Sequence, residues 1–229
     1  MINSKIISLF DLFLPRICLN CGEAINTDSN TICEKCFNQL EIATPERIKL
    51  EFERKFLKEK LVKDFYSAFV FKEDSAIQKM IHGLKYNKNF TIGSYLGIKT
   101  AKVLENKLKF WQADLIMAIP LHKLRKAERG FNQADIIAKA IGKEVKIKFS
   151  KNIIQRIRFT QTQTKLNLVE RKENMNGAFK IRKAKLVKDK NIILVDDVIT
   201  TGATVSECAK ILLENGAKNI YALSVAIAE

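Results

Sequence analysis

The segment from residue 192 to residue 213 constrains the fold of this chain more than any other. Residues 192–195 form a short apolar run rich in β-branched side chains, which is typical of a strand buried on both faces. Two carboxylates, Asp196 and Asp197, follow it directly, and apolar residues at helical spacing start at Val205. The pattern predicts a strand, a loop and a helix. In α/β proteins such a loop, at the carboxyl end of a strand, is where ligands bind.

The predicted loop is small and hydroxylic, with Thr200, Thr201, Gly202, Ala203 and Thr204. Hydroxyl groups and the free N–H groups of a helix start attract phosphate, and glycine lets the backbone come close to it. The two carboxylates would repel phosphate, so they need another partner such as sugar hydroxyls. A ribose 5-phosphate satisfies both requirements, whereas the chain contains neither G-x-x-x-x-G-K-[ST] nor G-x-G-x-x-G. The alternative is a buried strand that ends in surface acids before an ordinary loop.

Four of the five cysteines form two Cys-x-x-Cys pairs, Cys18 with Cys21 and Cys33 with Cys36. Four thiolates at this spacing predict a tetrahedral Zn²⁺ site. A disulfide pair and an iron–sulfur cluster are the alternatives, and the first fits a cytosolic chain badly. Because so short a segment buries little core, we expect the metal to stabilise it and its role to be structural or to form a docking surface.

A second predicted strand, residues 115–119, is broken by Pro120 and followed by a basic loop. The loop residues of interest are Leu121, His122, Lys123, Arg125 and Arg129. Each cation alone is more often solvated, but a cluster at the carboxyl end of a strand favours pyrophosphate binding. Lys85, at the end of a helix predicted from residues 77–84, is solvated by default, with anion binding as the alternative.

Residues 156–179 are polar and lack a long periodic stretch, so we expect a mobile hood over the bound ligand. Arg156 and Arg158 in this segment would neutralise pyrophosphate bidentately.

Charge is unevenly distributed along the 229 residues. The formal net charge is +15, and residues 139–190 carry sixteen Lys or Arg against four Asp or Glu. Such a basic field attracts polyanions, although a solvated lysine-rich surface explains it equally well. Residues 1–17 contain an apolar stretch that Asp11 interrupts, which predicts an amphipathic helix rather than a membrane span. We therefore expect a cytoplasmic protein without a transmembrane segment.

The motifs appear in the order typical of one family. The four cysteines precede Leu84-Lys-Tyr86, Arg129-Gly-Phe-Asn-Gln133, the Arg156-x-Arg158 segment and the Asp196–Asp197 loop. Together they resemble the competence protein ComF family, which is similar in fold to type I phosphoribosyltransferases. The resemblance implies an α/β fold: a Rossmann-like, mostly parallel sheet with flanking helices and a mobile hood. This domain would occupy residues 46–229, after an amino-terminal helix and zinc ribbon in residues 1–45.

The resemblance also implies a ligand, phosphoribosyl pyrophosphate (PRPP), bound together with Mg²⁺. Asp196 and Asp197 would contact the ribose hydroxyls as the catalytic acids, the threonine loop would hold the 5-phosphate, and the cations would hold pyrophosphate. The family is implicated in DNA uptake during natural transformation, which makes single-stranded DNA and other DNA-uptake proteins the expected partners. Whether the protein transfers phosphoribosyl groups stays open. The alternative is a non-catalytic protein that responds to PRPP or binds single-stranded DNA.

Overall fold

A parallel β-sheet forms the centre of the molecule. The computed structural model describes residues 16–25, 31–159 and 175–228, and in this part of the chain the main sheet has five strands in the order β1-β7-β6-β2-β3. The strands are β1 (Asp64–Phe71), β2 (Leu115–Ala118), β3 (Lys148–Phe149), β6 (Asn191–Ile199) and β7 (Asn219–Ala228). Every neighbouring pair is parallel, which confirms the expected α/β architecture.

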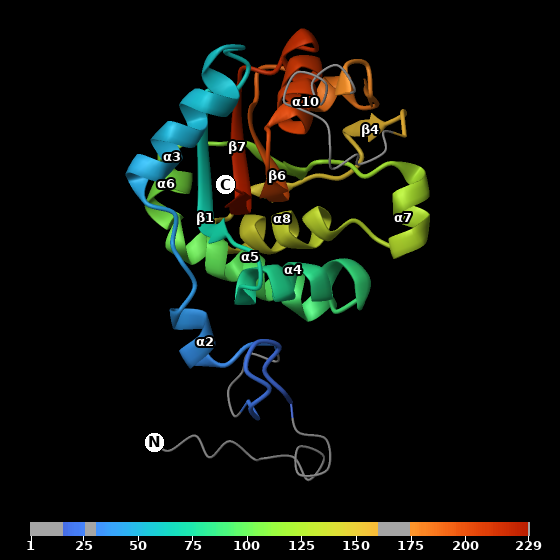
Figure 1. Cartoon of the computed structure of the whole chain (residues 1–229). Coiled ribbons are helices and arrows are strands. Elements are labelled where there is room, and N and C mark those ends of the chain that lie inside the picture. The colour runs from blue at the N-terminus through green and yellow to red at the C-terminus, as the bar shows by residue number, and fades with distance from the viewer. Residues whose placement is uncertain (1–15, 26–30, 160–174, 229) are drawn as a thin grey trace, which may run out of the picture.

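Helices cover both faces of this sheet (Figure 1). The helices and helical turns of the described residues are α2 (Glu34–Asn38), α3 (Pro45–Phe52), the π-helical turn η1 (Glu53–Leu57), α4 (Ala76–Tyr86), α5 (Phe90–Val103), α6 (Glu105–Phe110), α7 (Lys123–Arg129), α8 (Gln133–Glu144), the 3₁₀ turn η2 (Ala184–Leu186) and α10 (Ala203–Glu214). In Figure 1, α4, α5 and α8 lie on one side of the sheet, and α3 and α10 lie on the other. A short antiparallel pair, β4 (Ile154–Arg156) and β5 (Phe179–Ile181), lies near α10.

The central strand β6 explains why its sequence is a continuous apolar run. Ile193 and Val195 belong to the core beneath α4, α5 and α8, while Ile192 and Leu194 belong to the core beneath α3 and α10. Because side chains alternate along a strand, a strand covered on both faces needs apolar residues at every position.

The structure extends this strand beyond its predicted end. β6 continues to Ile199, because it stays paired with β7 up to the pair Ile199–Ile227. β2 ends earlier, with Ala118 opposite Val195. The expectation that the strand ends before Asp196 and Asp197 was therefore wrong. Both acids lie within β6, in the part that extends beyond the last residue pair with β2.

The basic segment after β2 also differs from the expected loop. Residues Lys123–Arg129 form the short helix α7, and Gly130, with a φ of 80°, ends it in the left-handed conformation. The expected amino-terminal helix in residues 1–17 falls almost wholly outside the described residues, as does most of the expected hood.

The cysteine module, residues 16–25 and 31–40, packs on the α4–α5 side of the sheet. Phe37 contacts the rings of Phe69 and Tyr95 edge-on, with centroid distances of 6.0 and 5.7 Å. Lys99 Nζ lies 4.4 Å from the centroid of the Phe37 ring. Buried module residues such as Ile32 belong to the same apolar cluster as α4 and α5. The module thus shares its core with the sheet domain.

Candidate functional site

The two acids at the end of β6 have different surroundings. Asp197 is only 4% exposed, and its Oδ2 lies 2.5 Å from the Nζ of Lys85 near the end of α4. Its Oδ1 accepts a hydrogen bond from the Val198 N–H at 3.0 Å. Asp196 is half-buried, and its Oδ1 accepts from the Asp197 N–H at 2.9 Å. The structure therefore pairs Lys85, for which the sequence left solvation and anion binding open, with Asp197, one of the two expected ribose ligands.

These contacts decide how the pair is charged. Burial raises the pKa of Asp196 well above its usual range, and the charge of Asp197 raises it further. Burial acts in the same direction on Asp197, but the charge and hydrogen bond of Lys85 outweigh it and lower the pKa of Asp197. The pair consequently holds its negative charge on Asp197. Asp196 next to it is suited to exchange hydrogen bonds with a hydroxyl group.

The threonine loop leads from these acids into α10. Gly202 precedes the helix with a φ of 78°, a conformation that glycine adopts without strain. Thr201 and Thr204 are partly exposed, and Thr201 Oγ1 accepts from the Ala203 N–H at 3.4 Å. The first N–H groups of a helix have no partner within the helix. Together with the helix dipole they make this end of α10 able to bind phosphate.

A segment that the sequence did not point to supports this loop from behind. A Cβ atom on Gly202 would lie 2.8 Å from the Phe56 ring and 3.2 Å from Cβ of Lys55, both in η1. Lys55 is itself buried and its Nζ lies 2.6 Å from Glu51 Oε2. The loop therefore fits its place only with glycine at this position.

The expected pyrophosphate ligands around α7 are placed in two ways. His122 is 5% exposed, and its Nδ1 accepts from the Leu124 N–H at 3.3 Å as the cap of α7, so its ring is turned into the protein. Lys123 is exposed and Leu121 is half-buried. The guanidinium of Arg129 lies 5.5 Å from the centroid of the Tyr86 ring. Tyr86 directly follows Lys85 in the sequence.

The two arginines of the expected hood also differ. Arg156 is half-buried; burial lowers the pKa of its guanidinium, and the negative charge of the nearby Asp196 acts in the opposite direction. It donates to the Met175 Sδ at 3.5 Å. Arg158 is exposed and donates to the Asn176 carbonyl oxygen at 3.0 Å. Of the two arginines, Arg156 is thus the one whose pKa the charge of Asp196 affects.

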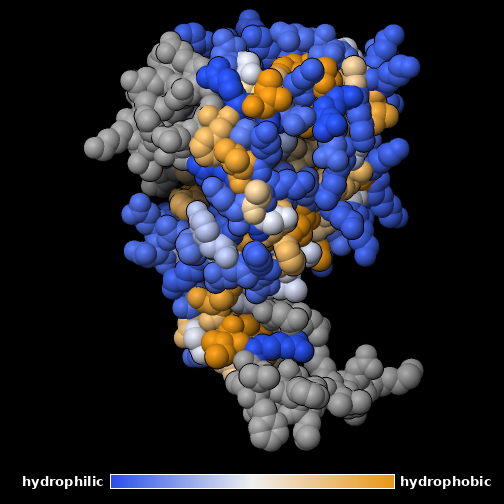
Figure 2. Space-filling view, turned by 90° about the vertical axis from the view of Figure 1, so that its right-hand side faces the viewer, coloured by the Kyte–Doolittle hydropathy of each residue, from blue (hydrophilic) through white to orange (hydrophobic). Residues whose placement is uncertain are grey.

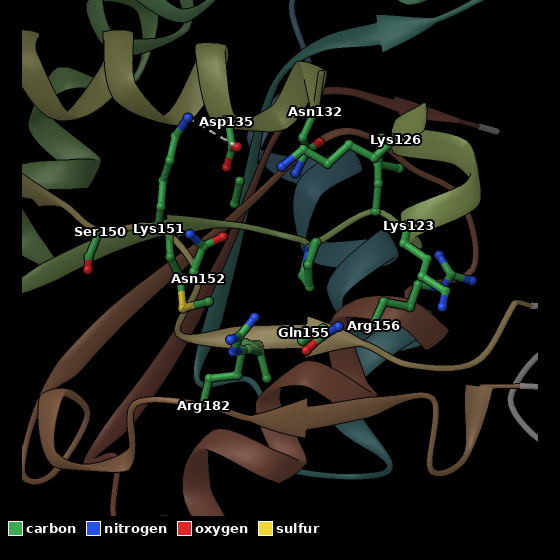
Figure 3. A pocket seen from close by; sticks show the side chains of 15 residues that line it. Lys123, Lys126, Asn132, Asp135, Ser150, Lys151, Asn152, Gln155, Arg156 and Arg182 are labelled. Carbon is green, nitrogen blue, oxygen red and sulfur yellow. Dashed lines mark ion pairs between the residues drawn. The ribbon is translucent and has the colours of Figure 1, made fainter. Parts of the chain in front are cut away.

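A basic cavity of about 210 Å³ adjoins the same edge of the sheet (Figure 3). Its charged lining comes from α7, α8, the 150–152 turn, β4 and the end of β5, namely Lys123, Lys126, Asp135, Lys151, Arg156 and Arg182. Lys151 Nζ lies 3.4 Å from Asp135 Oδ2, the ion pair drawn in Figure 3. The sequence reading missed Lys126, Lys151 and Arg182. The two-residue strand β3, after which Lys151 lies, is too short to give a periodic signal.

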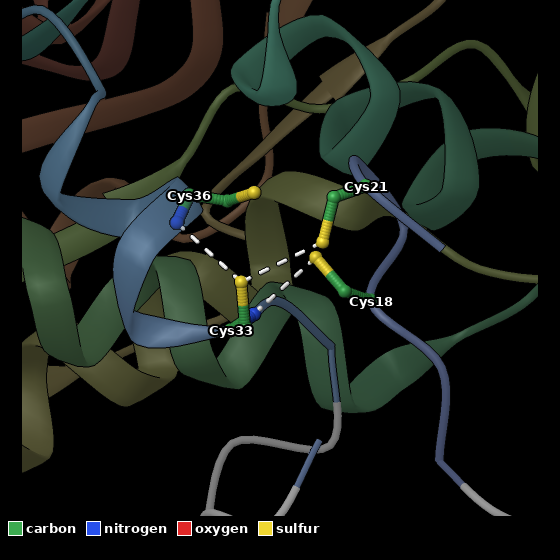
Figure 4. Close-up of side chains that lie close together, drawn as sticks. All are labelled: Cys18, Cys21, Cys33 and Cys36. Atoms are coloured by element: carbon green, nitrogen blue, oxygen red, sulfur yellow. Dashed lines mark hydrogen bonds between the residues drawn. The ribbon is translucent and has the colours of Figure 1, made fainter. Parts of the chain in front are cut away.

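The four cysteines converge on one point (Figure 4). Their Sγ atoms all lie within 4.8 Å of one another, and those of Cys21 and Cys33 are 3.8 Å apart. A Zn–S bond of about 2.3 Å in a tetrahedron places two sulfurs ~3.8 Å apart, so the cluster fits this ion. Backbone N–H groups point at the sulfurs, with Cys33 N 3.4 Å from Cys18 Sγ. The cluster can therefore hold a metal ion.

Two thiols of the cluster, Cys18 and Cys21, have pKa values that are shifted in opposite directions. Burial would raise the pKa of Cys18, but hydrogen bonds from three backbone N–H groups outweigh it and lower this pKa to about 6. A backbone hydrogen bond at Glu23 favours the Cys21 thiolate, yet burial and the three neighbouring sulfurs raise its pKa to about 12. A bound cation is the natural way to ionise all four thiols together.

A parallel sheet with two acids near the carboxyl end of its central strand, followed by a glycine-led helix start, is the arrangement of a phosphoribosyltransferase-type domain. Residues 101–228 match the family described as phosphoribosyl transferase domain, and the chain belongs to this family. Lys85, Phe56 and the cysteine cluster lie before the matched residues, so the family match alone does not account for them.

Relatives of the chain are named as DNA utilization or competence proteins. It is 33% identical to the DNA utilization protein YhgH of Escherichia coli over 147 residues, which are 63% of this chain and 64% of that protein. It is 33% identical to competence protein F of Haemophilus influenzae, over 64% of this chain and 66% of that protein. It is 26% identical to competence protein ComFC of Streptococcus pneumoniae over 90% of this chain and 80% of that protein. The expected resemblance to the ComF family is confirmed. In the described residues no helix has both the length and the apolar character needed to cross a membrane.

Proposed function

We propose that the edge formed by β6 and the start of α10 binds PRPP. The observation that carries the proposal is the pairing of a buried, ionised Asp197 with a glycine-led helix start five residues later. Asp196 and Asp197 would take the ribose hydroxyls. Thr200, Thr201, Gly202, Ala203 and Thr204 would take the 5-phosphate through N–H and hydroxyl groups.

The leaving pyrophosphate would face the cations beside this edge. Arg156 lies near enough to Asp196 for the charge of that carboxylate to raise the pKa of its guanidinium, and Lys123 and Arg129 belong to α7. Positive groups held at that position stabilise the negative charge that develops as the bond to the ribose C1 breaks. Leu121 would contribute its backbone. His122 is the expected ligand that fits least, because its ring caps α7.

Two metals belong to the proposal. Mg²⁺ would arrive with PRPP and neutralise pyrophosphate charge, and a cation beside Asp196 would favour the ionised carboxylate, which is a ligand of the type Mg²⁺ prefers. Zn²⁺ would bind Cys18, Cys21, Cys33 and Cys36 and have a structural role. All four cysteines then act as ligands, which leaves no coordination position for a substrate.

The names of the relatives suggest the biological setting. Because they are a DNA utilization protein and competence proteins, we propose that this protein serves DNA uptake or processing in the cytoplasm, together with other DNA-uptake proteins. Phosphoribosyl transfer to an acceptor nitrogen would be its reaction if it is an enzyme. Pyrophosphate release in a single turnover with candidate acceptors separates transfer from binding alone.

A non-catalytic protein that responds to PRPP or binds single-stranded DNA is the second candidate, and the basic segment 139–190 favours it. In that case DNA affinity falls steeply with salt, because binding to phosphates releases counterions. Reversing the charge of the exposed residues Lys183 and Lys185 would weaken it. Unchanged DNA binding in this variant contradicts the version in which single-stranded DNA is the ligand.

Calorimetric titration with PRPP and Mg²⁺ tests the ribose assignment. We expect Asp197→Asn to weaken PRPP binding about 100-fold, because a hydrogen bond to a charged group contributes about 1.5–3 kcal/mol. Asp189→Asn is the matched control, since this acid lies in the turn before β6, away from the proposed site. An unaltered titration of a folded Asp197→Asn protein contradicts the assignment.

A further inference from the structure

A second cavity, of about 320 Å³, lies between the end of α4 and α7. It is lined by Lys85, Tyr86, Lys88, Arg125, Glu128, Arg129 and Phe159. We propose that this cavity binds a nucleobase together with its phosphate group, either as a free nucleotide or as part of a single DNA strand.

Two aromatic rings at the cavity remain in contact with water. Tyr86 is 59% exposed and Phe159 is 40% exposed. Such rings offer a flat apolar surface on which a base can stack, whatever its identity. In the space-filling view of the face that carries α7, apolar side chains lie scattered among hydrophilic ones (Figure 2). This mixture differs from the continuous apolar patch that a protein partner usually covers.

Each ring is held in place by a neighbouring ring and a guanidinium group. Tyr86 lies 4.5 Å from the His82 ring, and Arg129 lies 5.5 Å from its centroid. Phe159 has the same arrangement, with the His122 ring at 5.2 Å and the Arg125 guanidinium at 5.9 Å. Arginine planes and aromatic rings are the two surfaces on which proteins stack unpaired bases. The cavity has both in duplicate.

The charges at the cavity suit a phosphate group. The lining of the cavity carries four positively charged side chains, Lys85, Lys88, Arg125 and Arg129, and one acid, Glu128, and Lys85 is paired with Asp197. A ligand with a planar base and a negative phosphate matches the rings and the excess positive charge together. A base without phosphate or a phosphate without base would use only half of the site.

This inference deepens the proposed function, because Lys85 lines the cavity and also contacts the proposed ribose ligand Asp197. A base bound here would lie beside the edge that we assign to PRPP. The inference rests on that assignment only for this placement. Base stacking on Tyr86 can be tested even if PRPP does not bind.

The test compares ligands with and without a base. Adenosine 5′-monophosphate, ribose 5-phosphate and a short oligothymidylate are titrated into the full chain and into Tyr86→Ala. Loss of stacking is expected to weaken the base-containing ligands about tenfold, since one stacked base contributes ~1–3 kcal/mol. Ribose 5-phosphate affinity stays the same, and Tyr86→Phe restores the base-containing ligands.

Phe110→Ala is the matched control, because this ring on α6 is 82% exposed and does not line the cavity. Phe159→Ala is the second variant, so that the result does not depend on one substitution. If adenosine 5′-monophosphate binds more tightly and depends on Tyr86, the ligand is a free nucleotide. If the oligothymidylate does so, the ligand is a single DNA strand. The inference is overturned if neither ligand depends on Tyr86 or Phe159, or if ribose 5-phosphate weakens as much. The PRPP assignment is tested separately by the Asp197→Asn titration, which leaves Tyr86 and Phe159 unchanged.

Discussion

The cysteine module and the β6–α10 edge are ordered by different means. The edge belongs to the central strand of the sheet, so its residues are positioned by strand pairing and by two apolar cores. The buried apolar residues of the module, among them Ile25, Ile32 and Leu40, join the core beneath α4 and α5, whereas its two turns are joined to each other through sulfur contacts such as Cys21 to Cys33. The comparison teaches that one proposed site is built by the fold, whereas the other depends on a ligand that the fold alone does not supply.

Metal removal gives the largest expected effect, and it should separate the two regions. Metal binding to isolated structural zinc peptides is worth about 10–16 kcal/mol at neutral pH, so chelation should unfold the module locally. We expect residues 31–40 to lose protection in hydrogen-exchange measurements while β6 and β7 keep theirs. Cys36→Ser should show the same loss of protection, and it should also fail to retain the proposed zinc ion.

Cys208→Ala is the control for the metal experiment, because this buried cysteine lies on α10, away from the cluster. It should keep a full complement of zinc. If chelated protein retains module protection, or if β6 loses it at the same chelator concentration, the contrast between the two regions is wrong.

Replacing Gly202 should break the edge from within. Gly202→Ala places a methyl group 2.8 Å from the Phe56 ring and forces a left-handed backbone, which itself costs about 1–2 kcal/mol. We expect thermal unfolding at a lower temperature and weaker PRPP binding by roughly tenfold or more. Gly216→Ala, after the other end of α10, has a similar positive φ, and its nearest contact is an ordinary 3.6 Å to Lys188. If both variants bind PRPP equally well, the support by Phe56 has no role in the site.

The pH dependence of PRPP binding gives the smallest expected effect and tests the Lys85–Asp197 pair. Lys85 lowers the pKa of Asp197, so the carboxylate, and the stability it contributes, should persist until the pH falls to that lowered value. In Lys85→Met both contributions of Lys85 are lost, so burial, which raises the pKa of Asp197, is opposed only by the hydrogen bonds with Asp196 and the Val198 N–H. Binding should then be lost at a higher pH on acidification, whereas Lys85→Arg should behave like the wild type. Superimposable pH profiles for Lys85→Met and wild type would contradict the assigned pair.

Much of this arrangement can be predicted from the sequence, because it depends on local patterns. The apolar run before Asp196 predicts a doubly covered strand, and two Cys-x-x-Cys pairs predict a four-sulfur cluster. The contributions of Phe56 and Lys151 could not be predicted in this way. Each reaches its site through tertiary packing, from a π-helical turn and from the end of a two-residue strand. The inward turn of His122 likewise follows from its capping of α7, which the basic composition of the segment concealed.

The most direct test of the PRPP assignment is a crystal structure of the full chain soaked with PRPP and Mg²⁺. We predict the 5-phosphate on the N–H groups of residues 201–205 and the ribose hydroxyls within hydrogen-bond distance of Asp196 and Asp197. A 5-phosphate bound elsewhere, with Asp197 contacting only Lys85, would contradict the account.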